Sequence, residues 1–363
     1  VNDDGSLGER NDLRVLSSEH KVGIHASPTC VMSYGDKDGA VGYLVGEENT
    51  GMRAMFTMMN NARLSVGLEG LALTDRSYQL AKKYALDRHQ GKALNSEVAA
   101  GESSPIVDHV DVRRMLLTMR SNSEAMRCLM YANAAAIDFS KMIVDDEEKK
   151  SWDSLAALLT PVSKGWGTDV GVEMTSLGIQ VHGGMGYIEE TGAAQHWRDI
   201  RIAPIYEGTN GIQAADLVFR KLPMSGGAVV EKFVKEMTAL ADELIADQTL
   251  KQIGLNLRTG IAQFVDGAQW LGERISSSPN DAAAGSAPFL RLTGIVFGGY
   301  YLAKSAQVAQ KKIDAGIGDL DFFRDKITVA EFYAEQILPT ATGLLPLVKK
   351  DSKLFYAIAS DRL

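Results

Sequence analysis

The pattern of apolar and polar positions divides the chain into a short strand-forming beginning and a long helical remainder. Residues 1 to about 48 are punctuated by turns and rich in Val, Ile, Tyr and Thr, which predicts short strands such as Cys30 to Tyr34 and Val41 to Val45. From Thr50 onward, apolar residues recur at spacings of three and four, as on one face of a helix. The pattern therefore predicts a mainly α protein with a small β segment at its beginning.

The helical part is predicted to contain two groups of helices. The first group has a helix over 60–87, one capped by Asp108 and running to about Ile143, and one over 151–177 that Gly178 ends and Pro161 kinks. The sequence Pro-Met-Ser-Gly-Gly at 223–227 is typical of a linker and indicates a domain boundary. After it, the pattern predicts further amphipathic helices at about 228–246, 248–277, 286–314 and 325–341.

Small residues and hydroxyls refine two of these helices. Gly67, Gly70 and Ala72 lie close together in the first long helix, which predicts a close approach to a neighbouring helix. Thr209 precedes a short helical segment that runs to Leu222, and threonine is a favourable N-cap residue.

Composition narrows the possible partners. The 363 residues carry a formal net charge of −8, with no basic stripe, which disfavours nucleic acid and anionic membranes as partners. Two cysteines, Cys30 and Cys128, are too few for a disulfide framework and suggest a reducing compartment, so a cytoplasmic protein is expected. His182 and His196 have no partners at ligand spacing, so no metal site is expected.

A candidate catalytic base lies in the run Ala203-Pro-Ile-Tyr-Glu-Gly-Thr-Asn-Gly-Ile-Gln213. Glu207 has the neutral, aromatic neighbours that a proton-abstracting carboxylate needs, because an apolar flank favours the uptake of a proton. Gly208 has no Cβ, so a substrate can approach the backbone closely. Taken alone, the run is more typical of a helix-entry turn with a surface glutamate.

A second motif precedes this run. Three glycines fall within four positions in Gln180-Val-His-Gly-Gly-Met-Gly-Tyr187, and such a loop leaves backbone amides uncovered for an anion such as pyrophosphate. A helix C-cap followed by a turn is the structural alternative. The spacing differs from the dinucleotide fingerprint and no alternating strand–helix pattern surrounds it, so nicotinamide binding is not expected.

Four segments together resemble the flavin-dependent acyl-CoA dehydrogenase family. They are the end of a middle β-domain at Gly23 to Cys30, an Arg motif at Asn61 to Arg63, the glycine loop at Gln180 to Gly186, and the Tyr-Glu-Gly-Thr segment at Ile205 to Gln213. Glu207 follows Gln180 by twenty-seven residues, and Arg88 follows Arg63 by twenty-five, as in medium-chain members. The resemblance covers about 1–222. The remainder resembles the helical extension of the 3-methylmercaptopropionyl-CoA dehydrogenase subgroup.

This resemblance implies a fold and domain order. Residues 1–48 would be the remnant of a middle β-domain, 49–222 a helical bundle domain with the flavin loop and the base, and 228–363 an extra C-terminal helical domain. The chain begins at Val1 within turn-rich sequence that resembles the inside of the middle domain. It is therefore expected to be an N-terminally truncated piece, with weakened retention of FAD and possible loss of activity.

The resemblance also implies the chemistry. Glu207 would remove the α-proton of an acyl-CoA, and FAD would take the β-hydride, giving a trans-2-enoyl-CoA. An electron-transfer flavoprotein would accept the electrons, and the chain would form a homo-oligomer, a dimer or tetramer. The acyl group would be 3-methylthiopropionyl or a short or medium chain. An acyl-CoA oxidase that uses oxygen and a non-catalytic helical assembly protein are the alternatives.

The resemblance assigns individual residues to ligands. FAD contacts fall on Arg88, Gln90, Gln180, Gly183, Gly184 and Thr209, and the resemblance implies that all of these except Thr209 reach the FAD of a neighbouring subunit. Substrate contacts fall on Arg63, Tyr206 and Gly208. Arg88 is equally suited to a structural role as a cation at a helix C-terminus. Gln90 is followed directly by Gly91, where the family has an aromatic residue first, and Gly211 stands where medium-chain members have Gln.

Overall fold

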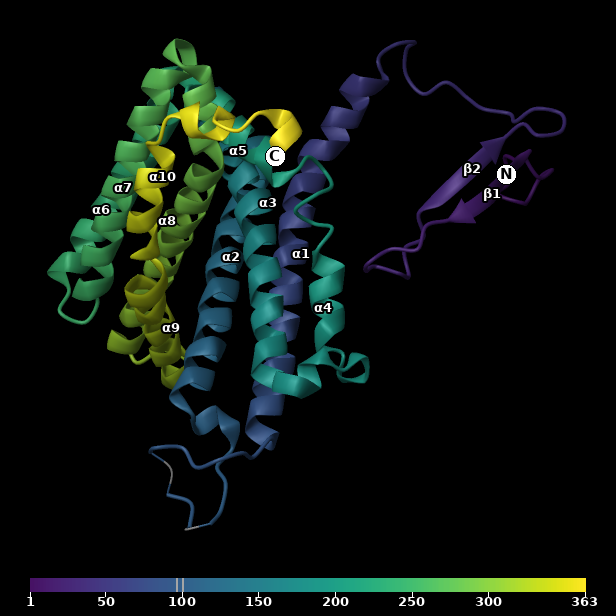
Figure 1. The fold of residues 1–363 in the computed structure, drawn as a ribbon. Helices are drawn as coiled ribbons and strands as arrows, with labels where there is room; N and C mark the ends of the chain where they lie inside the picture. Colours follow the sequence, from purple (N-terminus) through teal and green to yellow (C-terminus); the bar gives the residue numbers. More distant parts are fainter. Residues whose placement is uncertain (96, 100) are drawn as a thin grey trace. The chain divides into compact units, whose positions relative to one another are not determined.

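The computed structural model describes residues 1–95, 97–99 and 101–363, and all side chains in these ranges except those of residues 57 and 60. The chain divides into two compact units, Val1–Asn60 and Asn61–Leu363 (Figure 1). The described residues are mainly helical, which confirms the predicted fold class. None of the described helices is both long and apolar enough to cross a membrane.

The first unit contains a two-stranded antiparallel sheet. Strand β1 (Leu13–Ser18) pairs with β2 (Cys30–Tyr34), with Leu13 opposite Tyr34 and Ser18 opposite Cys30. The predicted strand at Cys30 to Tyr34 is confirmed, whereas the one at Val41 to Val45 is wrong, because this segment has no regular structure. The side-chain amide of Asn11 bonds the backbone N–H and carbonyl of Val41, at 2.9 and 2.8 Å, in place of a strand partner.

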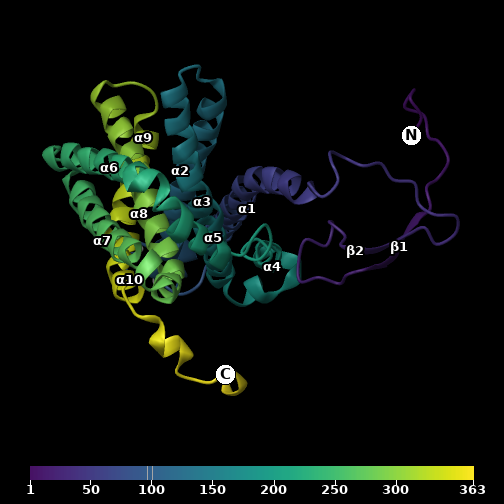
Figure 2. The same cartoon turned by 90° about the horizontal axis from the view of Figure 1, so that it is seen from above.

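The second unit is built of long helices around a shared apolar core. Helix α1 continues into it, α2 and α3 run through its centre, and α8 packs on both of them (Figures 1 and 2). The helices are α1 (Gly51–Asp87), α2 (Val110–Met142), α3 (Asp146–His182), α4 (Ala193–Ile200), α5 (Asn210–Asp216), α6 (Ala228–Ala246), α7 (Lys251–Ser277), α8 (Pro279–Asp314), α9 (Leu320–Phe332) and α10 (Thr340–Val348).

Helices α1 and α3 lie in backbone contact along a row of glycines. A Cβ on Gly67 would stand 2.6 Å from the carbonyl oxygen of Ser163, and one on Gly70 would stand 2.3 Å from that of Gly167. Both distances are far inside van der Waals contact, so only glycine fits at these positions. The expected close approach at Gly67 and Gly70 is confirmed, and this packing fixes the position of α3 along α1.

Helix α3 is longer than predicted at both ends. It begins at Asp146, where the side chain of Asp145 caps it by accepting a hydrogen bond from the Glu148 amide at 2.8 Å. Gly178 lies inside the helix and does not end it. A Cβ at this position would stand 2.1 Å from Ser77 Oγ, so the glycine allows α3 to pack closely against α1. Gly183, with a φ of 58°, is the residue that ends the helix.

Helix α2 also begins differently from the prediction. Asp108 belongs to a short 3-10 turn, Ile106–Asp108, and His109 is the N-cap residue of α2. The expected cap at Thr209 is confirmed, since its side chain accepts a hydrogen bond from the Ile212 amide at 3.3 Å.

The segment at 223–227 forms a tight turn between η4 (Leu217–Lys221) and α6. The turn, Met224–Gly227, places Ser225 and Gly226 in the left-handed region, with φ values of 53° and 67°. Helices on either side of it share one core, in which Trp166 of α3 fills the space over Gly294 of α8. A domain boundary at this turn stays a prediction.

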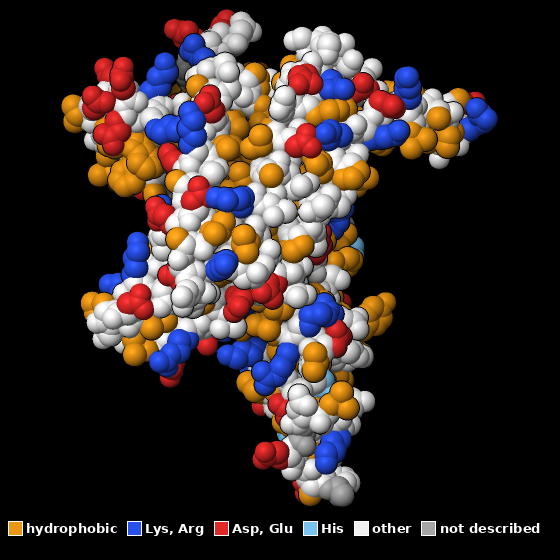
Figure 3. Space-filling view, turned by 90° about the vertical axis from the view of Figure 1, so that its left-hand side faces the viewer, with side chains coloured by type: hydrophobic (Ala, Val, Ile, Leu, Met, Phe, Trp, Pro, Cys, Tyr) orange, Lys and Arg blue, Asp and Glu red, His pale blue; other side chains and the backbone are white. Residues whose placement is uncertain are grey.

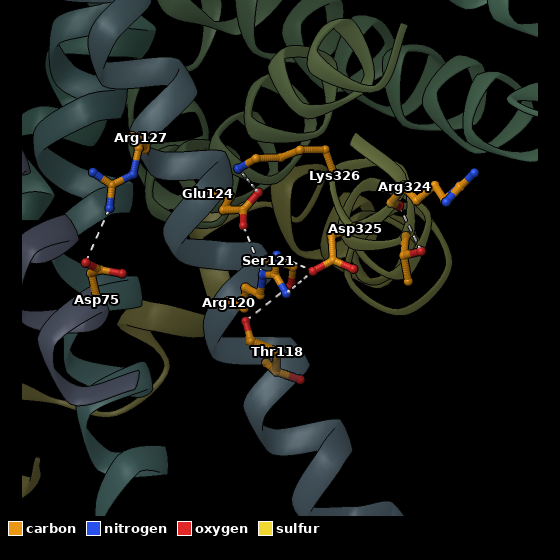
Figure 4. A network of polar contacts seen from close by, with 10 residues as sticks. Asp75, Thr118, Arg120, Ser121, Glu124, Arg127, Arg324, Asp325 and Lys326 are labelled. Carbon is orange, nitrogen blue, oxygen red and sulfur yellow. Dashed lines mark hydrogen bonds and ion pairs between the residues drawn. The ribbon is translucent and has the colours of Figure 1, made fainter. Parts of the chain in front are cut away.

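Charged side chains join α2 to α9 (Figure 4). Glu124, with 14% of its side chain exposed, accepts from Arg120 at 3.1 Å and from Lys326 at 2.7 Å. Arg120 also bonds Asp325 of α9 at 3.2 Å. Glu124 is therefore the centre of the network, because it neutralises two partly buried cations on two helices.

Replacement of Glu124 by Ala is expected to lower the free energy of unfolding by about 2 kcal/mol, because Arg120 and Lys326 would face each other without their shared anion. Urea unfolding followed by circular dichroism measures the change. The control is Asp321→Ala, which removes a carboxylate that is 89% exposed and is expected to change stability by less than about 0.5 kcal/mol. Equal losses in the two variants would contradict this account of the network.

Candidate active site

Glu207 lies in the loop between α4 and α5, on a strained turn. Glu207 and Gly208 have φ values of 55° and 82°, so two consecutive residues adopt the left-handed conformation. This conformation is unfavourable for a residue with a side chain and persists only where surrounding contacts enforce it. Glu207 Oε2 is buried and accepts no hydrogen bond from the described residues. The turn thus presents a carboxylate oxygen that no described residue bonds.

Tyr206 is held from α1. Its hydroxyl donates to the carboxylate of Glu69, at 2.6 Å from Oε1 and 2.5 Å from Oε2. Burial, followed by the Glu69 carboxylate, raises the pKa of Tyr206 well above its ordinary value, so the hydroxyl stays protonated and keeps donating. Glu69 was not among the residues predicted from the sequence. The sequence feature that could have indicated a role for Glu69 is its place as the single acidic residue among the apolar and small residues Gly67 to Leu71.

Gly208 is held from α3 and from α5. Its carbonyl oxygen accepts from Lys164 Nζ at 2.7 Å and from Gln213 Nε2 at 3.2 Å. Lys164 Nζ also donates to Asn210 Oδ1 at 2.9 Å, and Asn210 Nδ2 donates to Asp169 at 2.7 Å. This network was not predicted from the sequence, although Lys164 is a lone cation in an otherwise apolar and small stretch of α3.

Arg63 lies on the other side of the turn. Its Nη2 is 3.8 Å from the point where a Cβ on Gly208 would stand, so the guanidinium lies in van der Waals range of the turn. The structure therefore brings four predicted residues, Arg63, Tyr206, Glu207 and Gly208, to one place, with Thr209 as the cap of the following helix.

The glycine loop lies at the other end of α3. Gln180 is exposed in the last turn of the helix, and Gly183 and Gly184 are exposed with empty space where a Cβ would stand. Gly186 is buried, and a Cβ there would stand 2.4 Å from the carbonyl oxygen of Ile179. The first two glycines thus leave their backbone open to solvent, and the last one closes the loop against α3.

Arg88 and Gln90 lie at this same end. They follow α1, whose Tyr84 ring is 4.6 Å from the ring of His182 at the end of α3. Both residues are exposed, and the carbonyl of Gln90 accepts from His109 Nε2 at 2.9 Å. The predicted FAD contacts therefore form one cluster, apart from Thr209.

This cluster and the Glu207 turn are well separated. Lys164, which contacts the turn, and Gln180, in the glycine loop, are sixteen residues apart on α3. A rise of 1.5 Å per residue gives a distance of about 24 Å along the helix. Within one chain, the predicted base and the predicted pyrophosphate contacts therefore do not belong to one site. Among the described residues, no group of His, Cys, Asp and Glu could hold a metal ion.

Helical packing, the glycine loop and the Tyr-Glu-Gly-Thr turn together define a class of protein. Residues 49–222 match the family model described as "Acyl-CoA dehydrogenase, C-terminal domain", and residues 230–359 match "Acetyl-CoA dehydrogenase C-terminal like". The chain belongs to the acyl-CoA dehydrogenase family.

Individual relatives narrow the comparison. The chain is 44% identical over 335 residues to 3-methylmercaptopropionyl-CoA dehydrogenase of Ruegeria pomeroyi, covering 92% of this chain and 56% of that protein. It is 31% identical over 363 residues to a butyryl-CoA dehydrogenase of Syntrophomonas wolfei, covering 94% of this chain and 57% of the relative. The chain thus spans just over half of the length of these relatives.

Solved structures agree on the fold. An acyl-CoA dehydrogenase from Bacillus anthracis, crystallised with FAD, superposes with a TM-score of 0.73 at 18% identity, over 93% of this chain and 56% of that one. Caenorhabditis elegans ACDH-11 in complex with C11-CoA gives a TM-score of 0.72 at 21% identity, over 93% and 52% of the two chains.

Proposed function

We propose that this chain carries the base of a flavin-dependent acyl-CoA dehydrogenase that converts an acyl-CoA to a trans-2-enoyl-CoA. The observation that carries the proposal is the buried, unbonded Oε2 of Glu207 on a turn held by Lys164 and Tyr206, in a member of this family. A carboxylate oxygen without an internal hydrogen bond keeps its lone pairs for a substrate proton.

The residues at the far end of α3 suit an FAD pyrophosphate. Gly183 and Gly184 expose backbone without a Cβ, and Arg88 and Gln180 add exposed donors beside them. Backbone amides and a guanidinium are the donors that bind phosphate oxygens well. When bound, FAD supplies the acceptor for the β-hydride.

The chain's own residues perform the proton transfer. The carboxylate of Glu207 takes the α-proton, which is acidic because it is next to the thioester carbonyl. The backbone amide of Glu207 has no acceptor among the described residues and is available to the thioester oxygen. Arg63, beside Gly208, adds positive charge where the enolate develops. Tyr206 is bound to Glu69 by its hydroxyl, so its ring is the part left to line the acyl group.

The separation of the two clusters supports a site shared between subunits. A glycine loop about 24 Å along α3 from the base cannot hold the pyrophosphate of a flavin whose ring lies against that base. We therefore propose that the loop, with Arg88 and Gln90, binds the FAD of a neighbouring copy in a homo-oligomer. Thr209, in contrast, is proposed to contact the FAD that works with Glu207 of the same chain.

The proposed substrate follows from the relatives. The 44% identity to 3-methylmercaptopropionyl-CoA dehydrogenase favours the methylthio acyl group over the butyryl group of the less similar relative. An electron-transfer flavoprotein is the proposed acceptor.

Anaerobic titration of the flavin-loaded protein from the complete gene tests this function. Addition of 3-methylthiopropionyl-CoA is expected to bleach the flavin with formation of an equal amount of enoyl-CoA, and butyryl-CoA to bleach it more slowly. Turnover is expected to be supported by a dye or an electron-transfer flavoprotein and to consume little oxygen. Failure of every acyl-CoA to bleach the flavin would refute the proposal, and oxygen uptake equal to turnover would identify an oxidase.

A further inference from the structure

Lys164 is a buried lysine that the proposed chemistry does not use. It lies on α3, and none of its surface is exposed, although lysine is among the residues least often fully buried. Burial of an ammonium group is unfavourable unless hydrogen bonds and charges compensate it. Its place directly beneath the strained turn therefore calls for a specific explanation.

The contacts of Lys164 point to the turn itself. Its Nζ bonds the carbonyl of Gly208, which lies 44 residues later in the chain, and the side chain of Asn210, the first residue of α5. These two acceptors flank Thr209, so one ammonium group ties the turn and the helix after it to α3. Glu207, the proposed base, immediately precedes Gly208, the first of these two residues.

The charges around Lys164 keep this group cationic at neutral pH. Burial, and to a smaller extent the positive charge of Arg63, lower the pKa of Lys164 to about 8, against the opposing effect of the carboxylates of Asp169, Glu207 and Glu69. Since folding lowers this pKa from 10.5, the charged group opposes folding below about pH 8, and its cost falls as the pH rises toward 10.5. The charged Lys164 thus carries a cost in stability.

The acceptors do not depend on Lys164 alone. The Gly208 carbonyl also accepts from Gln213 Nε2 at 3.2 Å, and Asn210 Oδ1 also accepts from Thr168 Oγ at 3.3 Å. Removal of the ammonium group would therefore leave the Gly208 carbonyl with a donor, and Asn210 Oδ1 with a share of the Thr168 hydroxyl proton, which also goes to the Lys164 carbonyl at 2.8 Å. The Gly208 carbonyl has a second donor, so what the ammonium group adds there is a direct link between the turn and α3.

We propose that Lys164 is a positioning residue for the base: by anchoring the Gly208 carbonyl and Asn210 to α3, it holds Glu207 in the left-handed conformation that directs its carboxylate at the α-carbon of the substrate. This inference rests on the proposed function. It adds a residue that acts on the rate of proton removal through the backbone and that does not touch the substrate.

The test is Lys164→Met in the flavin-loaded protein from the complete gene, measured by anaerobic stopped flow with saturating acyl-CoA. The rate constant for flavin bleaching is expected to fall by about 10- to 100-fold, because misplacement by about 1 Å at a reacting group has effects of this size. The unfolding midpoint and flavin content are expected to stay at or above the wild-type values, and the Kd for acyl-CoA to stay within about threefold, since the contacts to the ligand remain.

A matched control is Lys326→Met, which removes a partly buried lysine from the Glu124 network on the far side of α2. It is expected to lower the unfolding midpoint and leave the bleaching rate unchanged, the reverse of Lys164→Met. If Lys164→Met yields no folded protein, Lys164→Gln, which keeps a neutral NH2 donor group, is expected to show an intermediate rate.

A wild-type bleaching rate in a folded Lys164 variant would overturn the inference, and so would a loss of rate that only mirrors a loss of folded protein. In either case an active wild-type enzyme would leave the proposed function intact. If the wild-type protein itself does not react with acyl-CoA, it is the proposed function that fails.

Discussion

Replacement of Glu207 by Gln is expected to lower the rate constant for flavin bleaching by about 10²- to 10⁴-fold, the usual contribution of a general base. Glutamine keeps the size and shape of the side chain, so the strained turn and its contacts to Lys164 and Tyr206 are preserved. Its amide, however, cannot accept the α-proton. Stopped-flow bleaching with saturating acyl-CoA measures the effect, and the Kd for acyl-CoA is expected to change little.

Glu190→Gln is the control for this substitution. Glu190 is exposed in the segment before α4, so the same chemical change there removes a charge without touching the turn. Its bleaching rate is expected to equal that of the wild type. A Glu207→Gln enzyme that retains more than about a tenth of the wild-type rate would contradict the assignment of Glu207 as the base.

The second large effect is expected from Gly70→Ala, which should lower the free energy of unfolding by about 3 kcal/mol. A Cβ at this position would stand 2.3 Å from the carbonyl oxygen and 2.8 Å from the carbonyl carbon of Gly167. Both atoms belong to the backbone of α3, so relief requires that the two long helices move apart. Because α3 carries Lys164, the bleaching rate is also expected to fall in the folded fraction.

Gly272→Ala provides the matched control. Gly272 lies inside α7, and a Cβ there would meet no atom within 4 Å. Alanine is the better helix former, so a gain of about 0.5–1 kcal/mol is expected. Thermal or urea unfolding of the two variants measures the contrast. A stability change of the same sign in both would contradict the account of the α1–α3 packing.

Local sequence signals predicted the helices and some of their ends. The three-and-four spacing identified the long helices because each buries one face in the common core. Glycine was the less reliable signal. Gly67 and Gly70 correctly indicated close packing, whereas Gly178 resembles a helix stop in the sequence and is instead a packing position against Ser77. A glycine has the same local signature in both roles, and only the neighbouring helix distinguishes them.

The site was predictable only where its residues form a continuous motif. Glu207 and its neighbours lie in one run, and the spacing from Gln180 identified the family. Lys164 and Glu69 lie 44 and 137 residues from their partners in the turn, so their roles depend on how α1 and α3 pack. The family resemblance implied that the glycine loop reaches the FAD of a neighbouring subunit, whereas the distance between loop and base along α3 follows only from the structure.

Exchange of the substrate α-proton tests the central claim most directly. An acyl-CoA with sulfur in place of the β-carbon has α-protons and no β-hydride, so it isolates the step assigned to Glu207. In deuterated buffer, the wild-type enzyme is expected to exchange the α-protons, as followed by mass spectrometry, and the Glu207→Gln enzyme with the same flavin content is not. Exchange at the wild-type rate in Glu207→Gln would show that another group removes the proton.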